Sequence, residues 1–399
     1  MNGRPERTMK LLKRTWADIS MDHLSHNYHL LRGKIPADCR FLGVVKADAY
    51  GHGAVPVSRQ LVDLGADYLA VSNMEEAVQL RRSYIRLPIL ILGYTPAFYA
   101  EDMVDMGIRQ EVHSLEYAEQ LNLALAGTGK RLKIHLKLDT GMSRLGFFAY
   151  DDPQTPDQLR LVAAMEHLVP EGIFTHFSVS DSLTEADRAF TALQFRRFSA
   201  MVKELEGSGV HFRLRHCCNS AATLLYPEYA LDMVRPGIAT YGICPSEELA
   251  GRFDLRPLMS LRTTISQLRP FGSDVGVSYG RSYVTAEPCR IAVLAIGYAD
   301  GLSRSLSNRV SFLLHGKRVP VVGRICMDMC MVDVSAVPEA KVGDVVTVFG
   351  ADGDETIAVD EIARLTGTIP YETLCSINKR TPRFYLDGEQ RMEVLQYIV

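Results

Sequence analysis

A single lysine follows a short apolar run in the stretch VVKADAYGHG, which covers residues 44–53. A lysine at the end of a strand can be a solvated charge, a phosphate contact, or an amine nucleophile whose pKa is depressed by burial and neighbouring cations. An isolated lysine does not distinguish these roles. Lys46 therefore has to be interpreted together with the other polar residues of the chain.

Several of those residues are suited to hold a phosphorylated ligand. Tyr50 lies four residues after Lys46 at the predicted start of a helix, and RPGIATYG brings Arg235 together with Gly237, whose backbone can approach a ligand closely. The sequence SAAT after Asn219 predicts a helix opened by a serine cap, where backbone N–H groups favour an anion. A phosphorylated aldehyde, held by its phosphate and captured by Lys46 as a Schiff base, would satisfy these groups.

A regular scaffold must position these residues, and the alternation of the sequence predicts one. Between about residues 41 and 242 the expected strands are FLGVV, DYLAV, LPILIL, IRQEV, LKIHLKL, GIFTHF, FRLRHC and MVRPGIATY, with helical patterns such as VPVSRQLVDLG and MEEAVQLRRSY between them. This repetition predicts a parallel (β/α)8 barrel, because each parallel crossover requires a helix. A doubly wound open sheet would show the same alternation.

The polar residues favour the barrel, since barrel enzymes place reactive groups at the C-terminal ends of their strands. Such residues recur at that position: Lys46 ends the first strand, Asn73 the second, Lys137 and Asp139 the fifth, His176 the sixth, Asn219 and Ser220 the seventh, and Arg235 the eighth. We expect all of them to converge on one rim.

After Pro245 the sequence changes to β-type runs such as RIAVLAIGYA and DVVTVFG, separated by Gly, Pro and Asp turns. We therefore expect an N-terminal tail at residues 1–14, a cofactor-binding barrel at residues 15–247 and a mostly β domain at residues 248–399. The segment TWADIS could contribute a strand to either domain.

The composition argues against several classes of function. The 399-residue chain has a net charge of −3 with interspersed charges, which argues against nucleic acid as a partner. The basic opening MNGRPERTMKLLKR precedes no secretory apolar core, and no later run is long enough to span a bilayer, so we expect a cytoplasmic protein without a membrane partner. The eight cysteines lack the spacing of a disulfide framework or a zinc site, which favours reduced thiols and no metal.

The ordered motifs of the chain resemble those of the alanine racemase family. They are KADAYGHG at 46–53, LDTGMSRLG at 138–146, RPGIATYG at 235–242, VSYG at 277–280, GYADG at 297–301, GRICMDMCMVDV at 323–334 and PYE at 370–372. The resemblance implies an α/β protein with a (β/α)8 barrel followed by a β domain, which interconverts L-alanine and D-alanine with pyridoxal 5'-phosphate (PLP). It also implies a supply of D-alanine for peptidoglycan and a homodimer whose active site is shared between subunits.

The resemblance also assigns the two bases. Lys46 matches the lysine that carries the cofactor, and Tyr279 in VSYG matches the second catalytic base, which in this family comes from the partner subunit. Two bases are wanted because a proton removed from one face of the substrate carbon must return from the other face to invert it.

Further roles follow from the same resemblance. Arg235 matches the arginine at the pyridine nitrogen; because a guanidinium stays protonated, the nitrogen should stay neutral, which disfavours transamination. Arg144 matches the residue that contacts the cofactor's phenolic oxygen and the substrate carboxylate. Lys137 matches a lysine that is carbamylated in many relatives; the alternative is an ammonium paired with Asp139.

The resemblance completes the site with cofactor and substrate contacts. The phosphate would be held by Tyr50, Ser220, Gly237, Ile238 and Tyr371, with Asn219 and His176 also at the cofactor and Met327 and Asp328 at the substrate. Tyr298 resembles part of the substrate entrance. The departures at Met329, Ser178 and Ser180 put pocket lining in doubt but touch neither base.

Other functions fit parts of this pattern. A serine or broad-specificity amino-acid racemase on the same scaffold is the nearest alternative, although the bulk of Tyr371 favours the small methyl group of alanine. A related decarboxylase would need a different C-terminal domain. A non-catalytic PLP carrier would need neither Tyr279 nor the β domain, and an aldolase that forms a Schiff base directly with its substrate would be colourless.

Overall fold

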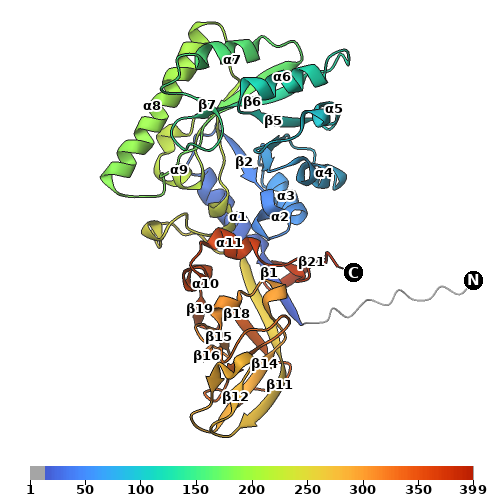
Figure 1. Cartoon of the computed structure of the whole chain (residues 1–399), viewed down its shortest axis with the longest axis vertical. Helices are drawn as coiled ribbons and strands as arrows, with labels where there is room; N and C mark the ends of the chain where they lie inside the picture. The colour runs from blue at the N-terminus through green and yellow to red at the C-terminus, as the bar shows by residue number, and fades with distance from the viewer. Residues whose placement is uncertain (1–13, 399) are drawn as a thin grey trace, which may run out of the picture. The chain divides into compact units, whose positions relative to one another are not determined.

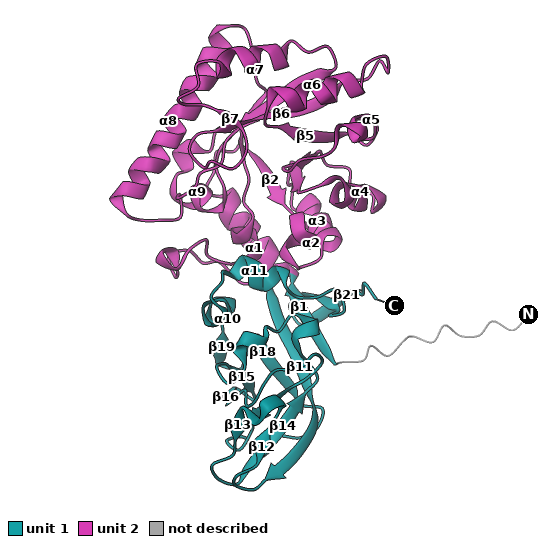
Figure 2. Ribbon diagram, in the orientation of Figure 1, with its two compact units in different colours: residues 1–20, 259–399 teal, residues 21–258 magenta. Residues whose placement is uncertain are grey.

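The computed structural model describes residues 14–398. The described residues divide into two compact units, one of residues 21–258 and one that joins residues 14–20 to residues 259–398 (Figure 2). The first is called the barrel unit below, and the second the β unit.

The barrel unit contains eight parallel strands in the order β10-β2-β3-β4-β5-β6-β8-β9. Figure 1 labels β2, β5 and β6 among them. The sheet curls until its two edges meet, where the N–H of Asp232 donates to the Arg215 carbonyl at 3.1 Å and that of Arg235 to the Cys218 carbonyl at 2.9 Å. The strands are β2 (Arg40–Val44), β3 (Tyr68–Val71), β4 (Ile89–Ile91), β5 (Ile108–Val112), β6 (Leu132–Asp139), β8 (Leu168–Phe174), β9 (Leu214–His216) and β10 (Met233–Val234), with the short β7 (Phe147–Phe148) beside β6. The predicted barrel is confirmed.

The longer helices of the barrel unit bury an apolar stripe. In α8, for example, Phe198, Met201, Val202 and Leu205 recur at helical spacing and are buried, and the helix begins where the Thr184 side chain accepts from the N–H of Asp187. The helices are α1 (Met21–Arg32), α2 (Lys46–Tyr50), α3 (Ala54–Asp63), α4 (Met74–Arg82), α5 (Ala100–Asp105), α6 (Leu115–Ala124), α7 (Thr155–Ala163), α8 (Glu185–Gly207) and α9 (Ser220–Leu225).

The β unit is built around a mixed sheet in the order β16-β15-β18-β11-β1-β20-β21, and β14, β17 and β19 extend it (Figure 1). The strands are β1 (Thr15–Ser20), β11 (Met259–Phe271), β14 (Cys289–Leu294), β15 (Ser311–Leu314), β16 (Lys317–Pro320), β17 (Cys330–Asp333), β18 (Val345–Asp352), β19 (Glu355–Ile357), β20 (Arg383–Asp387) and β21 (Gln390–Leu395), with the separate pair β12 (Gly276–Val277) and β13 (Tyr283–Val284). The helices α10 (Val359–Thr366) and α11 (Pro370–Cys375) complete it. A mostly β C-terminal domain was predicted, and this is confirmed.

The boundaries of the units differ from those expected at residues 15 and 247. Strand β1 pairs antiparallel with β11 and parallel with β20, so the segment TWADIS lies in the β unit and the barrel unit begins at residue 21. The barrel unit then continues to residue 258. Of the expected tail, residues 1–13 lie outside the described residues, and Arg14 contacts Asp300 of the β unit. No helix among residues 14–398 is long and apolar enough to cross a membrane.

Candidate active site

Lys46 is the first residue of an unusual turn that follows strand β2. The next four residues of α2, 47–50, all have left-handed backbone, with φ between 52° and 55°. None of them is glycine, and left-handed helical backbone costs L-residues roughly 1–2 kcal/mol each. The sequence predicted that Tyr50 would start a helix, but Tyr50 is the last residue of this left-handed turn.

Side chains from the same unit hold the strained turn in place. Glu76 of α4 accepts from the backbone N–H of Ala47 at 2.7 Å and, through its second oxygen, from that of Ser72 at 2.7 Å. The Asp48 carboxylate accepts from the N–H of Ala54 at 2.8 Å. Because backbone strain of this kind concentrates at functional sites, the turn is a candidate for one.

Tyr50, Ser220 and Gly237 form a small cradle of hydroxyl and amide groups. The Ser220 hydroxyl accepts from the N–H of Gly237 at 2.8 Å and from that of Ala239 at 3.2 Å. A Cβ placed on Gly237 would lie only 2.5 Å from the Tyr50 hydroxyl, so glycine is required for this approach. Ile238 begins the short 3-10 turn η3, and the first N–H groups of such a turn have no partner within it.

The helix beside this cradle, α9, begins one residue earlier than predicted. The sequence suggested a serine cap, but Asn219 is the N-cap and its side chain accepts from the N–H of Ala222 at 2.9 Å. The Ser180 hydroxyl donates to Asn219 Oδ1 at 3.0 Å and fixes that side chain. Ser220 is thus the first helical residue, and its hydroxyl bonds the cradle amides instead.

Arg235 is buried and hydrogen-bonded on several sides. Its Nη1 donates to Nδ1 of His216 at 2.8 Å, and its Nη2 donates to the carbonyl oxygens of Thr175 at 2.7 Å and Cys217 at 3.2 Å. Burial lowers the pKa of Arg235 to about 10, so the side chain remains protonated at neutral pH. Within residues 14–398 the Nε–H has no hydrogen-bond partner and can donate to a ligand.

A chain of buried polar groups continues from His216 across the barrel. His216 Nε2 lies 2.8 Å from His135 Nδ1, and His135 Nε2 lies 3.7 Å from Glu171 Oε2. Since a guanidinium only donates, His216 accepts at Nδ1 and carries its hydrogen on Nε2, and His135 therefore accepts at its own Nδ1. Burial lowers the pKa of both histidines, which agrees with neutral rings.

The far end of this chain is anionic. Burial alone would raise the pKa of Glu171, but contacts with His135, Arg109 and Lys133 hold it well below its usual range. Arg109 and Lys133 each lie 2.9 Å from a Glu171 oxygen. The chain therefore runs from a buried cation at the rim to a buried carboxylate.

His176 marks the place where the predicted cations converge. Nη2 of Arg235 lies 3.4 Å from Nδ1 of His176. The pKa of His176 lies well below its ordinary value, first because of burial and then because of the positive charges of Arg235, Lys137, Arg144 and Lys46. The rim of the barrel is therefore electropositive and suited to an anionic ligand.

Lys137 is buried in strand β6, with its Nζ 4.7 Å from the centroid of the Phe174 ring. Burial and the charge of Arg235 lower the pKa of Lys137 to about 8, against the opposite effect of Glu111. A lysine with this pKa presents a substantial fraction of neutral amine near neutral pH, unlike an ordinary lysine.

Asp139, two residues further along β6, shapes the loop that carries Arg144. Its Oδ1 accepts from the N–H groups of Gly141, Met142 and Ser143 at 2.8, 3.0 and 3.1 Å. Arg144 follows directly and is exposed. The loop is thus ordered by backbone bonds while its arginine remains available to a ligand.

The remaining predicted residues lie in the β unit. Tyr279 is 70% exposed at the start of the 3-10 turn η5 (Tyr279–Arg281), and the Ser278 hydroxyl donates to the Arg324 carbonyl at 2.7 Å. Tyr279, Cys326 and Met329 line a surface hollow of about 530 Å³.

The neighbouring substrate residues are also accessible in this unit. Met327 is 54% exposed, and Asp328 is half exposed and accepts from Arg380 at 2.8 Å. Tyr371 is the second residue of α11 and is partly buried. The predicted contacts of these residues with the barrel residues stay predictions.

Comparisons with known proteins agree with this geometry. Residues 19–245 match the family described as "Alanine racemase, N-terminal domain" and residues 258–385 match "Alanine racemase, C-terminal domain". The chain belongs to the alanine racemase family.

Individual members of the family match along nearly their whole length. The alanine racemase of Desulfovibrio desulfuricans is 45% identical over 93% of this chain and 98% of the relative, and alanine racemase 2 of Caldanaerobacter subterraneus is 41% identical over 97% and 98%. The solved alanine racemase of Clostridium difficile 630 superposes with a TM-score of 0.92 at 37% identity, covering 98% of this chain and 100% of that one. The alanine racemase of Bacillus anthracis, solved with bound L-Ala-P, gives a TM-score of 0.91 at 33% identity over 96% and 98%.

Several residues that support this site were not predicted from the sequence. His216, His135, Glu76 and Glu171 were given no role from the sequence. One signal was present, because His135, Lys137 and Asp139 alternate along LKIHLKLD and must share one face of the strand. Polar residues that alternate along one strand of this barrel therefore indicate a buried hydrogen-bond network as well as a ligand site.

Proposed function

We propose that this protein is an alanine racemase that interconverts L-alanine and D-alanine with PLP, and that it supplies D-alanine for peptidoglycan in the cytoplasm. The observation that carries the proposal is the gathering of Lys46, Lys137, Arg144 and Arg235 around His176, beside the cradle of hydroxyl and amide groups. The names of the relatives support alanine as the substrate and do not favour the broad-specificity alternative.

The barrel residues fit PLP. The cradle of Tyr50, Ser220, Gly237 and Ile238 would hold the phosphate, since hydroxyls and backbone amides are its ordinary partners. The Nε–H of Arg235 would donate to the ring nitrogen. When bound, PLP supplies an electron-withdrawing ring and an imine-forming carbonyl, which together make the α-proton of an amino acid removable.

The remaining cofactor contacts complete this assignment. The neutral His176 would lie against the ring, Asn219 would fix the start of α9, and Tyr371 would add a hydroxyl to the phosphate. The Nε–H of Arg235 supports the arrangement, because the hydrogen bonds of Arg235 to its neighbours use Nη1 and Nη2 and leave Nε–H available to a ligand.

Lys46 and Tyr279 are proposed as the two bases. Inversion requires one group to take the proton from one side of the substrate carbon and another to deliver a proton on the opposite side. The Lys46 amine and the Tyr279 hydroxyl would exchange the roles of acid and base with the direction of the reaction. Arg144 and the residues Met327 and Asp328 would orient the substrate.

The active protein is proposed to be a homodimer in which Tyr279 serves the partner's barrel. Tyr279 and Met329 line the same hollow of the β unit, and both side chains are exposed, as is that of the nearby Met327. Exposed apolar surface of this kind is typical of an interface between subunits. A second copy of the chain would bury it and receive the phenol.

Lys137 is proposed to be carbamylated. Its neutral amine would attack carbon dioxide, forming a C–N bond and releasing one proton, and the product would be an anion beside Arg235 and Arg144. The lowered pKa supports this step because only the unprotonated amine reacts. The negative charge would then hold Arg144 at the substrate.

The proposal is tested by incubating the purified, PLP-loaded protein with L-alanine in deuterated water. We expect D-alanine to form together with deuterium at the α-carbon, and L-serine to react much more slowly. Equal turnover of serine would favour the broad-specificity racemase, and a yellow protein without turnover of either amino acid would favour a PLP carrier.

A further inference from the structure

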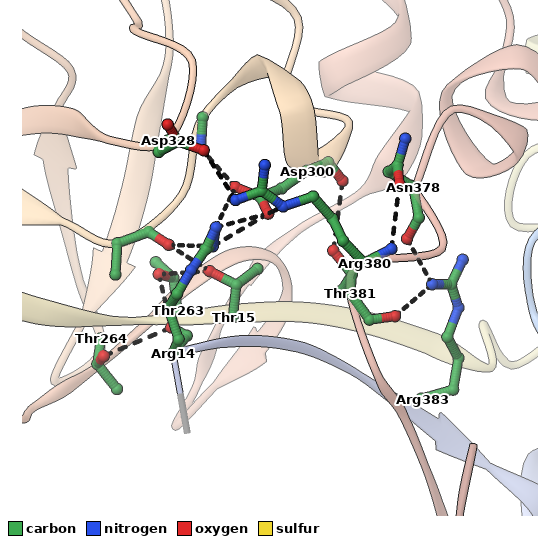
Figure 3. A network of polar contacts seen from close by, with 12 residues as sticks. Arg14, Thr15, Thr263, Thr264, Asp300, Asp328, Asn378, Arg380, Thr381 and Arg383 are labelled. Carbon is green, nitrogen blue, oxygen red and sulfur yellow. Dashed lines mark hydrogen bonds and ion pairs between the residues drawn. The ribbon is translucent and has the colours of Figure 1, made fainter. Parts of the chain in front are cut away.

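The motif GYADG of the β unit contains a buried carboxylate that the proposed reaction does not use. Asp300 is 1% exposed, yet its two oxygens accept from two guanidinium groups and one backbone amide (Figure 3). Arg14 donates to Asp300 at 2.8 to 3.0 Å from both Nη atoms, Arg380 Nε lies 3.1 Å from Oδ1, and the N–H of Gly297 lies 2.9 Å from Oδ2. Both oxygens of the Asp300 carboxylate therefore have donors, and the side chain is a fixed anchor for the groups bonded to it.

Arg380 extends this anchor to the substrate loop, defined here as residues 326–328. While its Nε contacts Asp300, its Nη2 donates to Asp328 Oδ1 at 2.8 Å (Figure 3). The two arginines and two aspartates balance in charge, so the cluster carries no uncompensated buried charge. One planar guanidinium thus joins a buried carboxylate to the loop.

The segment that carries Arg380 is itself fixed. The buried Arg383 donates to the carbonyl oxygens of Asn378 and Ile377 at 2.8 Å each, and also to that of Thr381. The N–H of Asn378 donates in turn to the carbonyl oxygen of Asp300 at 3.1 Å. Arg380 therefore projects from a braced turn.

The substrate loop also pairs with the turn that contains Asp300. The N–H of Tyr298 donates to the Cys326 carbonyl at 3.0 Å, and that of Ala299 donates to the Met327 carbonyl at 3.0 Å. Asp300 ends the same turn, η6 (Tyr298–Asp300), and caps it through Gly297. The buried carboxylate thus holds the loop both through this turn and through Arg380.

We propose that Arg380 is a positioning residue for alanine binding. Its guanidinium bonds both Asp300 and Asp328 and so fixes the substrate loop relative to the buried carboxylate. The inference rests on the proposed function, in which Met327 and Asp328 contact the substrate. Arg380 would not touch the reacting atoms. Its loss should therefore weaken substrate binding while the chemical step is preserved.

The first test is a kinetic comparison of Arg380→Gln with Arg318→Gln. Arg318 is another partly exposed arginine of the β unit, paired with Glu361 at 2.8 Å, and serves as the matched control. We expect Arg380→Gln to raise the KM for alanine about tenfold with kcat within about twofold, as the loss of a charged hydrogen bond that acts on binding implies. A KM equal to that of the control would overturn the proposal, as would a loss confined to kcat.

The second test is a double-mutant cycle with Asp328→Asn. If the Arg380 to Asp328 bond carries the effect, the double variant should be no worse than the more impaired single variant. Fully additive losses would show that the two residues act separately and would contradict the inference.

The third test does not depend on substrate. Amide hydrogen exchange at Tyr298 and Ala299 should accelerate in Arg380→Gln and remain unchanged in Arg318→Gln, because these two amides pair the turn with the loop. Unchanged hydrogen exchange at these amides would show that Arg380 does not hold the substrate loop. A loosened loop in a protein that never turns over alanine would instead count against the proposed function.

Discussion

Arg235 donates a hydrogen bond from Nη1 to Nδ1 of His216 at 2.8 Å, and both side chains are buried. A guanidinium has no acceptor, so the direction of this bond is fixed and the His216 ring must be neutral at that nitrogen. The same bond orients Arg235 so that its Nε–H remains available to a ligand. The charge placed at the proposed ring-nitrogen site is therefore positive.

Replacement of this charge should change the course of the reaction. In Arg235→Glu, a carboxylate at the same place would favour a protonated ring nitrogen and so a stronger electron sink. We expect racemisation to fall about 10²–10³-fold while the rate of transamination with alanine rises. Pyruvate formation in single-turnover assays measures the second quantity, and an unchanged side-reaction rate would count against the role assigned to Arg235.

The two histidines behind Arg235 should differ in their effects. His135→Leu leaves the Nε2–H of His216 without its acceptor, so we expect the free energy of unfolding to fall by about 1–3 kcal/mol with little change in activity. His216→Leu should destabilise the fold similarly but also increase transamination, because it releases Arg235. Denaturant unfolding measures the loss of stability in each variant, and the side-reaction assay measures transamination. Equal rates of transamination in His135→Leu and His216→Leu would contradict the claim that His216 orients Arg235.

Gly237→Ala should impair cofactor binding. A Cβ at this position would lie 2.5 Å from the Tyr50 hydroxyl, so the cradle must open. We expect the affinity for PLP to fall about tenfold or more, as the loss of charge-assisted contacts implies. Gly207→Ala, where a Cβ would meet nothing within 4 Å, is the control. Equal affinity of both variants for PLP, measured by titration and absorbance, would contradict the role of the cradle in holding the phosphate.

Carbamylation of Lys137 should depend on pH. Because the pKa of Lys137 is lowered to about 8, neutral amine accumulates as the pH rises through that value rather than through the ordinary value of 10.5. We expect incorporation of ¹³C-labelled carbon dioxide, followed by ¹³C NMR, to increase over the same interval and to vanish in Lys137→Met. The absence of labelled carbamate both below and above this pKa would show that Lys137 is not carbamylated.

The repeated strands and helices of the barrel could be predicted from the sequence, whereas features that occur once in the fold could not. Alternating apolar runs predicted the barrel and placed Lys137 and Arg235 at strand ends because burial and period are local signals. The unit that strand β1 joins was left open, because its partners, β11 and β20, are distant in sequence.

Two details of the site could not be predicted from the sequence either. The left-handed backbone of residues 47–50 carries no glycine signal and depends on Glu76 from another helix. The cap shifted from Ser220 to Asn219 because both residue types can cap, and only the contact of Ser220 with Gly237 decides between them.

The central claim is that Lys46 and Tyr279 act on opposite sides of one carbon. It is tested most directly by α-proton exchange in deuterated water with pure L-alanine and pure D-alanine as separate substrates of PLP-loaded Tyr279→Phe. The account predicts that racemisation falls about 10²–10⁴-fold while one enantiomer alone still exchanges its α-proton, without inversion. Racemisation near the wild-type rate, or equal exchange of both enantiomers, would contradict it.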